Sequence, residues 1–99
     1  MIIIQHYEIT DIFIGAFFLS QGGSLQGIRI KDAVRGIAAF EISGPDLDRL
    51  DQEYRSGQAL VNPVRLRESL NLLRDMLFDL RERRRDDRKR TNRRHQAFR

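Results

Sequence analysis

The longest apolar run in the chain lies between residues 12 and 19 and reads IFIGAFFL. Thr10 and Asp11 precede it and carry the side-chain oxygens that cap the amino end of a helix. Gly22 and Gly23 follow it and can end a helix, because glycine adopts the left-handed conformation without a Cβ clash. We therefore expect a short helix that is apolar nearly all round and buried within the domain.

Strand patterns lie on both sides of this helix. Residues 2–9 are rich in isoleucine and are typical of a strand. Residues 25–31 and 34–42 predict two further strands joined at residues 32–33, since apolar and charged side chains alternate in the first of them. The Ser-Gly-Pro sequence of residues 43–45 is expected to end the third strand.

Two more helices follow these strands. Pro45 predicts the first turn of a short helix that reaches about Tyr54. Asn62 and Pro63 predict the start of the last helix, as its capping and first residues. Leucines then recur at alternating spacings of four and three residues, which we call the leucine stripe: Leu66, Leu70, Leu73, Leu77 and Leu80. Ser69, Leu72 and Met76 are expected to widen this stripe. The spacing predicts an amphipathic helix, much of whose apolar side covers the sheet.

The order of elements is therefore β-α-β-β-α-α, and the expected fold class is α+β. We expect a small antiparallel three-stranded sheet with helices packed on one face, and a long C-terminal helix that extends into an arginine-rich end. Residues 1–80 are expected to form the compact domain, and residues 81–99 the arginine-rich C-terminal extension. The 99-residue chain contains no cysteine, which excludes disulfides and thiolate metal sites.

Charge is distributed unevenly along the chain. Residues 81–99 contain nine arginines and one lysine against three acidic residues, a net charge of +7. The other 80 residues have a net charge of −3. A basic segment on an acidic body points to nucleic acid, a membrane surface or another acidic partner.

Several short motifs follow one another in a recognisable order: YEITD at residues 7–11, AFFL at 16–19, IAAFE at 37–41 and ALVNP at 59–63. In order and spacing they resemble a small uncharacterised family of bacterial and phage proteins, a domain of unknown function, over roughly residues 7–80. The resemblance implies a phage or mobile-element setting in bacteria. It implies no activity, and the arginine-rich extension lies outside it. The absence of cysteine fits a reducing compartment, so we expect the protein in the cytoplasm of a bacterial cell.

The arginine-rich extension is the strongest candidate for a functional site. Arginine forms bidentate contacts with phosphate and stacks on bases, so we expect nucleic acid, DNA or RNA, as the partner. The expected nucleic-acid-binding residues are Arg81, Arg83, Arg84, Arg85, Arg88, Lys89, Arg90, Arg93 and Arg94. Two alternatives stay open: a partner that is only protein, and a disordered basic tail that serves solubility.

Two weaker candidates lie elsewhere in the chain. A possible secondary basic patch on the strand hairpin consists of Arg29, Lys31 and Arg35. A possible protein interface, for a larger complex or a homodimer, consists of Met76, Leu77 and Leu80. The interface requires these side chains to be exposed.

The sequence gives little support to catalysis, metal binding or membrane insertion. His6 and His95 are far apart and have no neighbouring nucleophile, so we expect no catalytic residues and no enzyme activity. Asp75 and Asp79 lie one helical turn apart, but a solvated helix face is the simpler interpretation, and we expect no metal and no cofactor. No apolar run reaches the length of a membrane span, and no basic residue precedes the first isoleucines, so neither a membrane protein nor a signal peptide is expected.

Overall fold

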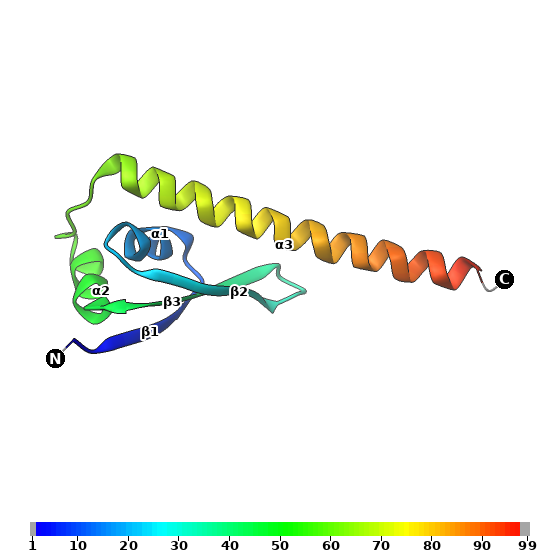
Figure 1. Ribbon diagram of the computed structural model, residues 1–99, viewed down its shortest axis with the longest axis horizontal. Coiled ribbons are helices and arrows are strands. Elements are labelled where there is room, and N and C mark those ends of the chain that lie inside the picture. Colours follow the sequence, from blue (N-terminus) through cyan, green and yellow to red (C-terminus); the bar gives the residue numbers. More distant parts are fainter. Residues whose placement is uncertain (1, 98–99) are drawn as a thin grey trace.

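Over residues 2–97, whose backbone the computed structural model describes, the chain folds into a three-stranded antiparallel sheet and three helices (Figure 1). Side chains are described for residues 2–85. The elements are β1 (Ile4–Ile9), α1 (Ile12–Ser20), β2 (Ser24–Asp32), β3 (Ile37–Pro45), α2 (Leu47–Ser56) and α3 (Pro63–Ala97). The predicted α+β fold and its order of elements are confirmed, including the long C-terminal helix.

The central strand of the sheet is β3, which pairs antiparallel with β1 on one side and β2 on the other. Leu25 of β2 lies opposite Ile42, and Ile28 lies opposite Phe40. Leu25 and Ile28 are three residues apart, yet both point to the same face because a bulge between Leu25 and Gly27 adds one residue to β2. The sheet therefore has one apolar face for the helices to cover.

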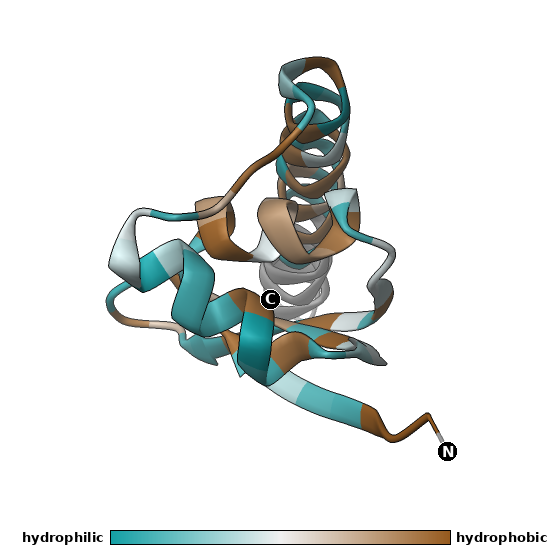
Figure 2. Ribbon diagram, turned by 90° about the vertical axis from the view of Figure 1, so that its left-hand side faces the viewer, coloured by the Kyte–Doolittle hydropathy of each residue, from teal (hydrophilic) through white to brown (hydrophobic). Residues whose placement is uncertain are grey.

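The buried helix α1 lies between this face and α3 (Figure 2). Asp11 begins the helix, since its Oδ1 accepts a hydrogen bond from the backbone N–H of Phe13 at 2.9 Å. Residues 14–18 are all buried, because one side of α1 meets the sheet and the other meets α3. Burial on both sides explains why the sequence of α1 is apolar nearly all round.

The partner of the leucine stripe differs from our prediction. We expected the leucines to cover the sheet, but α3 packs mainly on α1, which occupies the space between them (Figure 1). Leu73 is fully buried, and a Cβ atom at Gly15 would lie 3.3 Å from its Cδ1 atom. The two helices approach closely at this point because Gly15 has no side chain.

The hairpin between β2 and β3 also differs from the prediction. We placed the start of the third strand at Val34, but β3 begins at Ile37. Asp32 Oδ1 accepts hydrogen bonds from the backbone N–H groups of Val34 and Arg35, both at 3.1 Å, which bends the chain into a turn. Gly36 completes the turn with φ of 72°, a conformation that favours glycine.

The end of β3 and the start of α2 were predicted two to three residues too early. Residues 43–45 do not break the strand, because they pair with Ile4, Gln5 and His6 of β1. Helix α2 therefore begins at Leu47 and not at Pro45. It lies over β1 on the same face as α1, tied there by hydrogen bonds from Gln5 and Tyr7 to Asp48.

Candidate functional site

Helix α3 is longer than its contact with α1, so its two parts lie next to different elements. Along the first part of α3, the leucine stripe rests on α1. Further along, α3 continues past α1 and runs beside the tip of the β2–β3 hairpin (Figure 1). The space between α3 and the hairpin forms a cleft of about 250 Å³.

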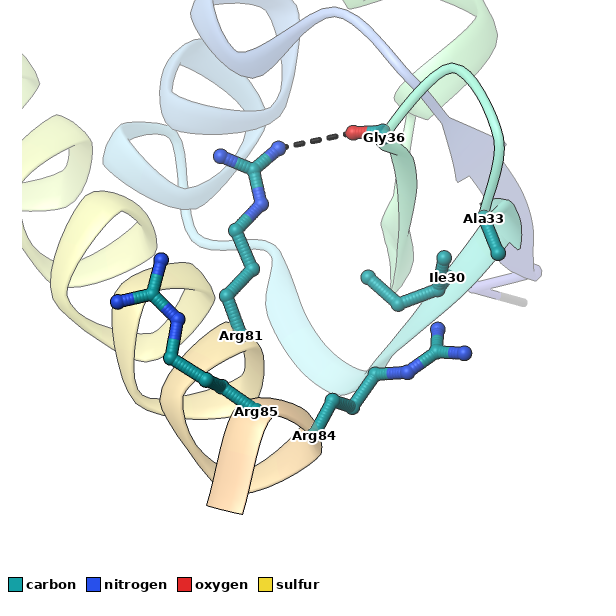
Figure 3. Close-up of a pocket in the computed structure, with 6 residues that line it drawn as sticks. All are labelled: Ile30, Ala33, Gly36, Arg81, Arg84 and Arg85. Atoms are coloured by element: carbon teal, nitrogen blue, oxygen red, sulfur yellow. Dashed lines mark hydrogen bonds between the residues drawn. The ribbon is translucent and has the colours of Figure 1, made fainter. Parts of the chain in front are cut away.

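We call this space the arginine cleft (Figure 3). One wall comes from the hairpin and the other from α3, and the lining residues are Ile30, Ala33, Gly36, Arg81, Arg84 and Arg85. Three arginines of α3 thus lie beside a hairpin wall that carries no charged side chain. Clustered positive charges of this kind attract an anion.

Arg81 joins the two walls of the arginine cleft. Its Nη2 donates a hydrogen bond to the backbone carbonyl of Gly36 at 2.8 Å (Figure 3). A guanidinium group has five N–H donors, so four remain for a ligand. The bond also fixes the position of the side chain, which lowers the entropy lost when a ligand binds.

Arg84 and Arg85 occupy different sides of the same helical turn. Arg84 lies four residues after Leu80 and continues the leucine stripe, and it extends toward the hairpin (Figure 3). Arg85 forms an ion pair with Glu82 across 3.6 Å, in which its side chain stays 69% exposed. At this exposure the pair is weak and leaves the guanidinium accessible to another anion.

The remaining predicted arginines fall into two groups. Arg83 is exposed and lines a second cleft of about 210 Å³ between α3 and β2, together with Ile28, Met76, Asp79 and Leu80. The other residues lie on the described backbone of α3, but their side chains lie outside the described residues: Arg88, Lys89, Arg90, Arg93 and Arg94. The predicted helical extension is confirmed for the backbone as far as Ala97.

The basic patch predicted on the hairpin proves to be a network of ion pairs. Arg29 Nη2 lies 2.7 Å from Glu8 Oε2, and Lys31 Nζ lies 3.5 Å from Glu8 Oε1. The hydrogen bond from Arg29 is the main reason that the pKa of Glu8 is lowered. Arg35 pairs with Asp32 in the turn at 3.7 Å. Because carboxylates balance these cations, the patch offers a polyanion less than the arginine cleft does.

The predicted apolar interface is partly used inside the protein. Leu77 packs against the core, and Leu80 is half-buried, whereas Met76 is 40% exposed. Leu72, which we expected to widen the leucine stripe, is 50% exposed, and Phe78, which sequence reasoning missed, is 64% exposed. Their exposure follows from their positions away from the leucine stripe, which helical spacing alone could have indicated.

Asp48 connects α2 to β1. Helix α2 lies at the opposite end of the sheet from the tip of the β2–β3 hairpin (Figure 1). Gln5 Nε2 donates to Asp48 Oδ2 at 2.7 Å, and the Tyr7 hydroxyl donates to Asp48 Oδ1. The hydrogen bond from the Tyr7 hydroxyl to Asp48, with a smaller contribution from burial, raises the pKa of Tyr7 to about 12. The contacts explain why α2 stays over β1.

Metal sites and membrane spans are the other features considered for the described part of the chain. No group of three or more histidine, aspartate or glutamate side chains there could hold a metal ion. No helix among the described residues is long and apolar enough to cross a membrane.

Comparison with known protein families, with proteins of curated function and with solved structures finds no match to this chain. The resemblance of residues 7–80 to an uncharacterised family therefore stays a prediction.

Proposed function

We propose that this protein is a non-enzymatic accessory protein of a phage or mobile element that binds nucleic acid, DNA or RNA, through the arginine-rich end of α3. It would act as a subunit of a larger nucleoprotein complex. The observation that carries the proposal is the arginine cleft, where Arg81, Arg84 and Arg85 line one cavity beside the hairpin. A cluster of arginines with a defined position is suited to successive phosphate groups.

Electrostatics support the same proposal. The extension has a net charge of +7 and the rest of the chain −3, so a polyanion is attracted to one end of the molecule. Packing of the leucine stripe on α1 holds the first part of α3 in place and so orients the cleft. Contacts of this kind go to phosphates, which carry no sequence information, so we expect weak sequence specificity.

The test is binding of labelled oligonucleotides to the full chain, measured by fluorescence anisotropy at physiological salt. We expect wild type to bind, and the combined alanine variant of Arg83, Arg84, Arg85, Arg88 and Arg90 to lose most of its affinity. If about six arginines contact phosphates, the slope of log K against log salt is about −5 for duplex DNA and about −4 for a single strand.

The matched control removes arginines from the body of the protein. Arg49 and Arg55 of α2 form exposed ion pairs with Glu53 and Asp51 and lie outside the arginine cleft. Their double alanine variant should keep the affinity of wild type. Unchanged binding by the five-arginine variant would overturn the proposal.

A second candidate function is a protein-interaction module, such as a virion component, an assembly adaptor or an inhibitor of a host or defence enzyme. The exposure of Leu72 and Met76, one turn apart on α3, favours it. Light scattering of wild type beside a Leu72→Ser/Met76→Ser variant tests this candidate. A dimer that becomes a monomer in the variant supports it, and a monomer in both argues against it.

A further inference from the structure

Phe78 is a large aromatic side chain that the core of the protein does not use. It is 64% exposed, although the leucine on its amino-terminal side, Leu77, packs against the core. Successive residues of a helix are turned by about 100°, so Phe78 lies on nearly the opposite side of α3 from Met76. The apolar side chains of α3 that face β2 therefore do not extend to it.

Helical spacing surrounds Phe78 with arginines. Arg74, Arg81 and Arg85 lie four residues before it, three after it and seven after it, which places them all on its side of α3. Two carboxylates share this face: Asp75, and Glu82, which pairs with Arg85. The face keeps a net positive charge, and two of its arginines also line the arginine cleft.

We propose that Phe78 is a base-stacking residue and that this face of α3 binds single-stranded nucleic acid. Phosphates would contact Arg81 and Arg85, and the base of an adjoining nucleotide would lie on the ring of Phe78. This inference rests on the proposed function and adds the class of nucleic acid. Bases in a duplex stack on each other and offer only their edges, whereas an unpaired base has a free face for an aromatic ring.

Charge distinguishes this occupant from an apolar protein surface. A protein that covered Phe78 would have to remove the neighbouring guanidinium groups from water, which is unfavourable unless it supplies anions. Leu72 is also exposed on α3, but Glu68 and Asp75 lie one turn away on its side of the helix. Their carboxylates repel a polyanion. Leu72 is therefore a matched control for an exposed apolar side chain in a different electrostatic setting.

The experiment compares a labelled oligothymidylate with a DNA duplex of the same length, using fluorescence anisotropy on the full chain. Phe78→Ala should weaken binding of the single strand roughly 5- to 150-fold, the range for one base stacked on an aromatic ring, and leave duplex binding unchanged. Phe78→Tyr should restore the single-strand affinity and Phe78→Leu should not. Leu72→Ala should resemble wild type.

A spectroscopic arm uses the absence of tryptophan from the chain. The Phe78→Trp variant carries a single indole, whose fluorescence should be quenched when a base stacks on it. We expect quenching by the oligothymidylate and little by the duplex. Equal quenching by both, or none by either, would contradict stacking at this position.

The outcomes separate this inference from the proposed function. Wild-type affinity of Phe78→Ala for the single strand overturns the stacking, while the five-arginine variant can still lose binding and leave the proposed function intact. An equal loss on single strand and duplex also overturns it. If Phe78→Ala instead changes the oligomeric state in light scattering, a second copy occupies the face. If wild type binds neither probe, both proposals fail.

Discussion

The two halves of α3 belong to one helix but meet different surroundings. Up to Leu77, the helix presents leucines to the core around α1, and Leu73 among them is fully buried. Leu80 instead lines a cleft beside Ile28 of β2. Arg81, Arg84 and Arg85 line the cleft beside the hairpin, and Arg84 occupies the next position of the leucine stripe. The change from leucine to arginine thus comes after α3 has passed the core. One half therefore stabilises the fold, and the other presents charge.

A continuous helix has a physical advantage over a separate tail in this arrangement. Starting a helix is costly, but extending one adds a hydrogen bond for each residue fixed. Packing of the leucine stripe fixes the direction of the first half of α3. The arginine half continues in that direction as part of the same helix and needs no core contacts of its own. We therefore expect substitutions in the first half to change stability and those in the second half to change binding.

The largest effect should come from the core contact between α3 and α1. Leu73→Ala should lower the free energy of unfolding by about 2–5 kcal/mol, because it leaves a cavity beside Gly15. Chemical denaturation followed by circular dichroism measures the change. The neighbouring Leu72→Ala is the control, since Leu72 is 50% exposed and should change stability far less. An equal loss of stability at the two positions would contradict the assignment of Leu73 to the buried face and Leu72 to the exposed face of α3.

A smaller loss of stability is expected where α1 leads into β2. A Cβ atom at Gly23 would lie 2.8 Å from the backbone carbonyl oxygen of Phe18, so the backbone must shift. Gly23→Ala should therefore cost about 1–3 kcal/mol in denaturation. Gly27→Ala is the control, because its Cβ would meet only Glu41 Oε2 at 3.7 Å. Nucleic-acid binding of the folded Gly23→Ala protein should match that of wild type, and a selective loss of binding would contradict the account.

The smallest effect concerns pH. The Tyr7 hydroxyl donates to Asp48, which raises the pKa of Tyr7 to about 12 in the folded protein. In an unfolded chain the value is about 10. The stabilising contribution is therefore complete below about pH 10 and is lost as pH rises through 12. Ultraviolet absorbance of tyrosinate in wild type and in Tyr7→Phe gives the pKa by difference.

An ordinary pKa for Tyr7 in that titration would show that the bond between β1 and α2 is absent in solution.

The sequence predicted the elements of the fold because their signals are local. Asp11 caps α1 through an oxygen two residues from its donor, and the leucine stripe repeats within one helix. It did not predict what the leucine stripe packs on, since periodicity identifies a buried face and not its partner. Val34 was assigned to the start of the third strand, but the Asp32 side chain bends the chain there and leaves Val34 97% exposed.

The candidate site was predictable only in its charges. The arginines are evident in the sequence, but Arg81 and its hydrogen-bond acceptor, Gly36, lie 45 residues apart. Only folding brings the hairpin tip beside α3 and makes a cleft from them. Phe78, by contrast, could have been found from the sequence, because helical spacing alone turns it about 100° away from Leu77 and off the leucine stripe.

We propose that the arginine end of α3 binds a polyanion without contributing to the stability of the fold. The most direct test is the salt dependence of oligonucleotide binding by the Arg81→Ala/Arg84→Ala/Arg85→Ala variant, with its denaturation curve recorded alongside. We predict that the slope of log K against log salt for a single strand becomes shallower by about 2, since three phosphate contacts are lost. The denaturation curve should stay close to that of wild type. An unchanged slope, or a loss of binding that accompanies unfolding, would contradict the account.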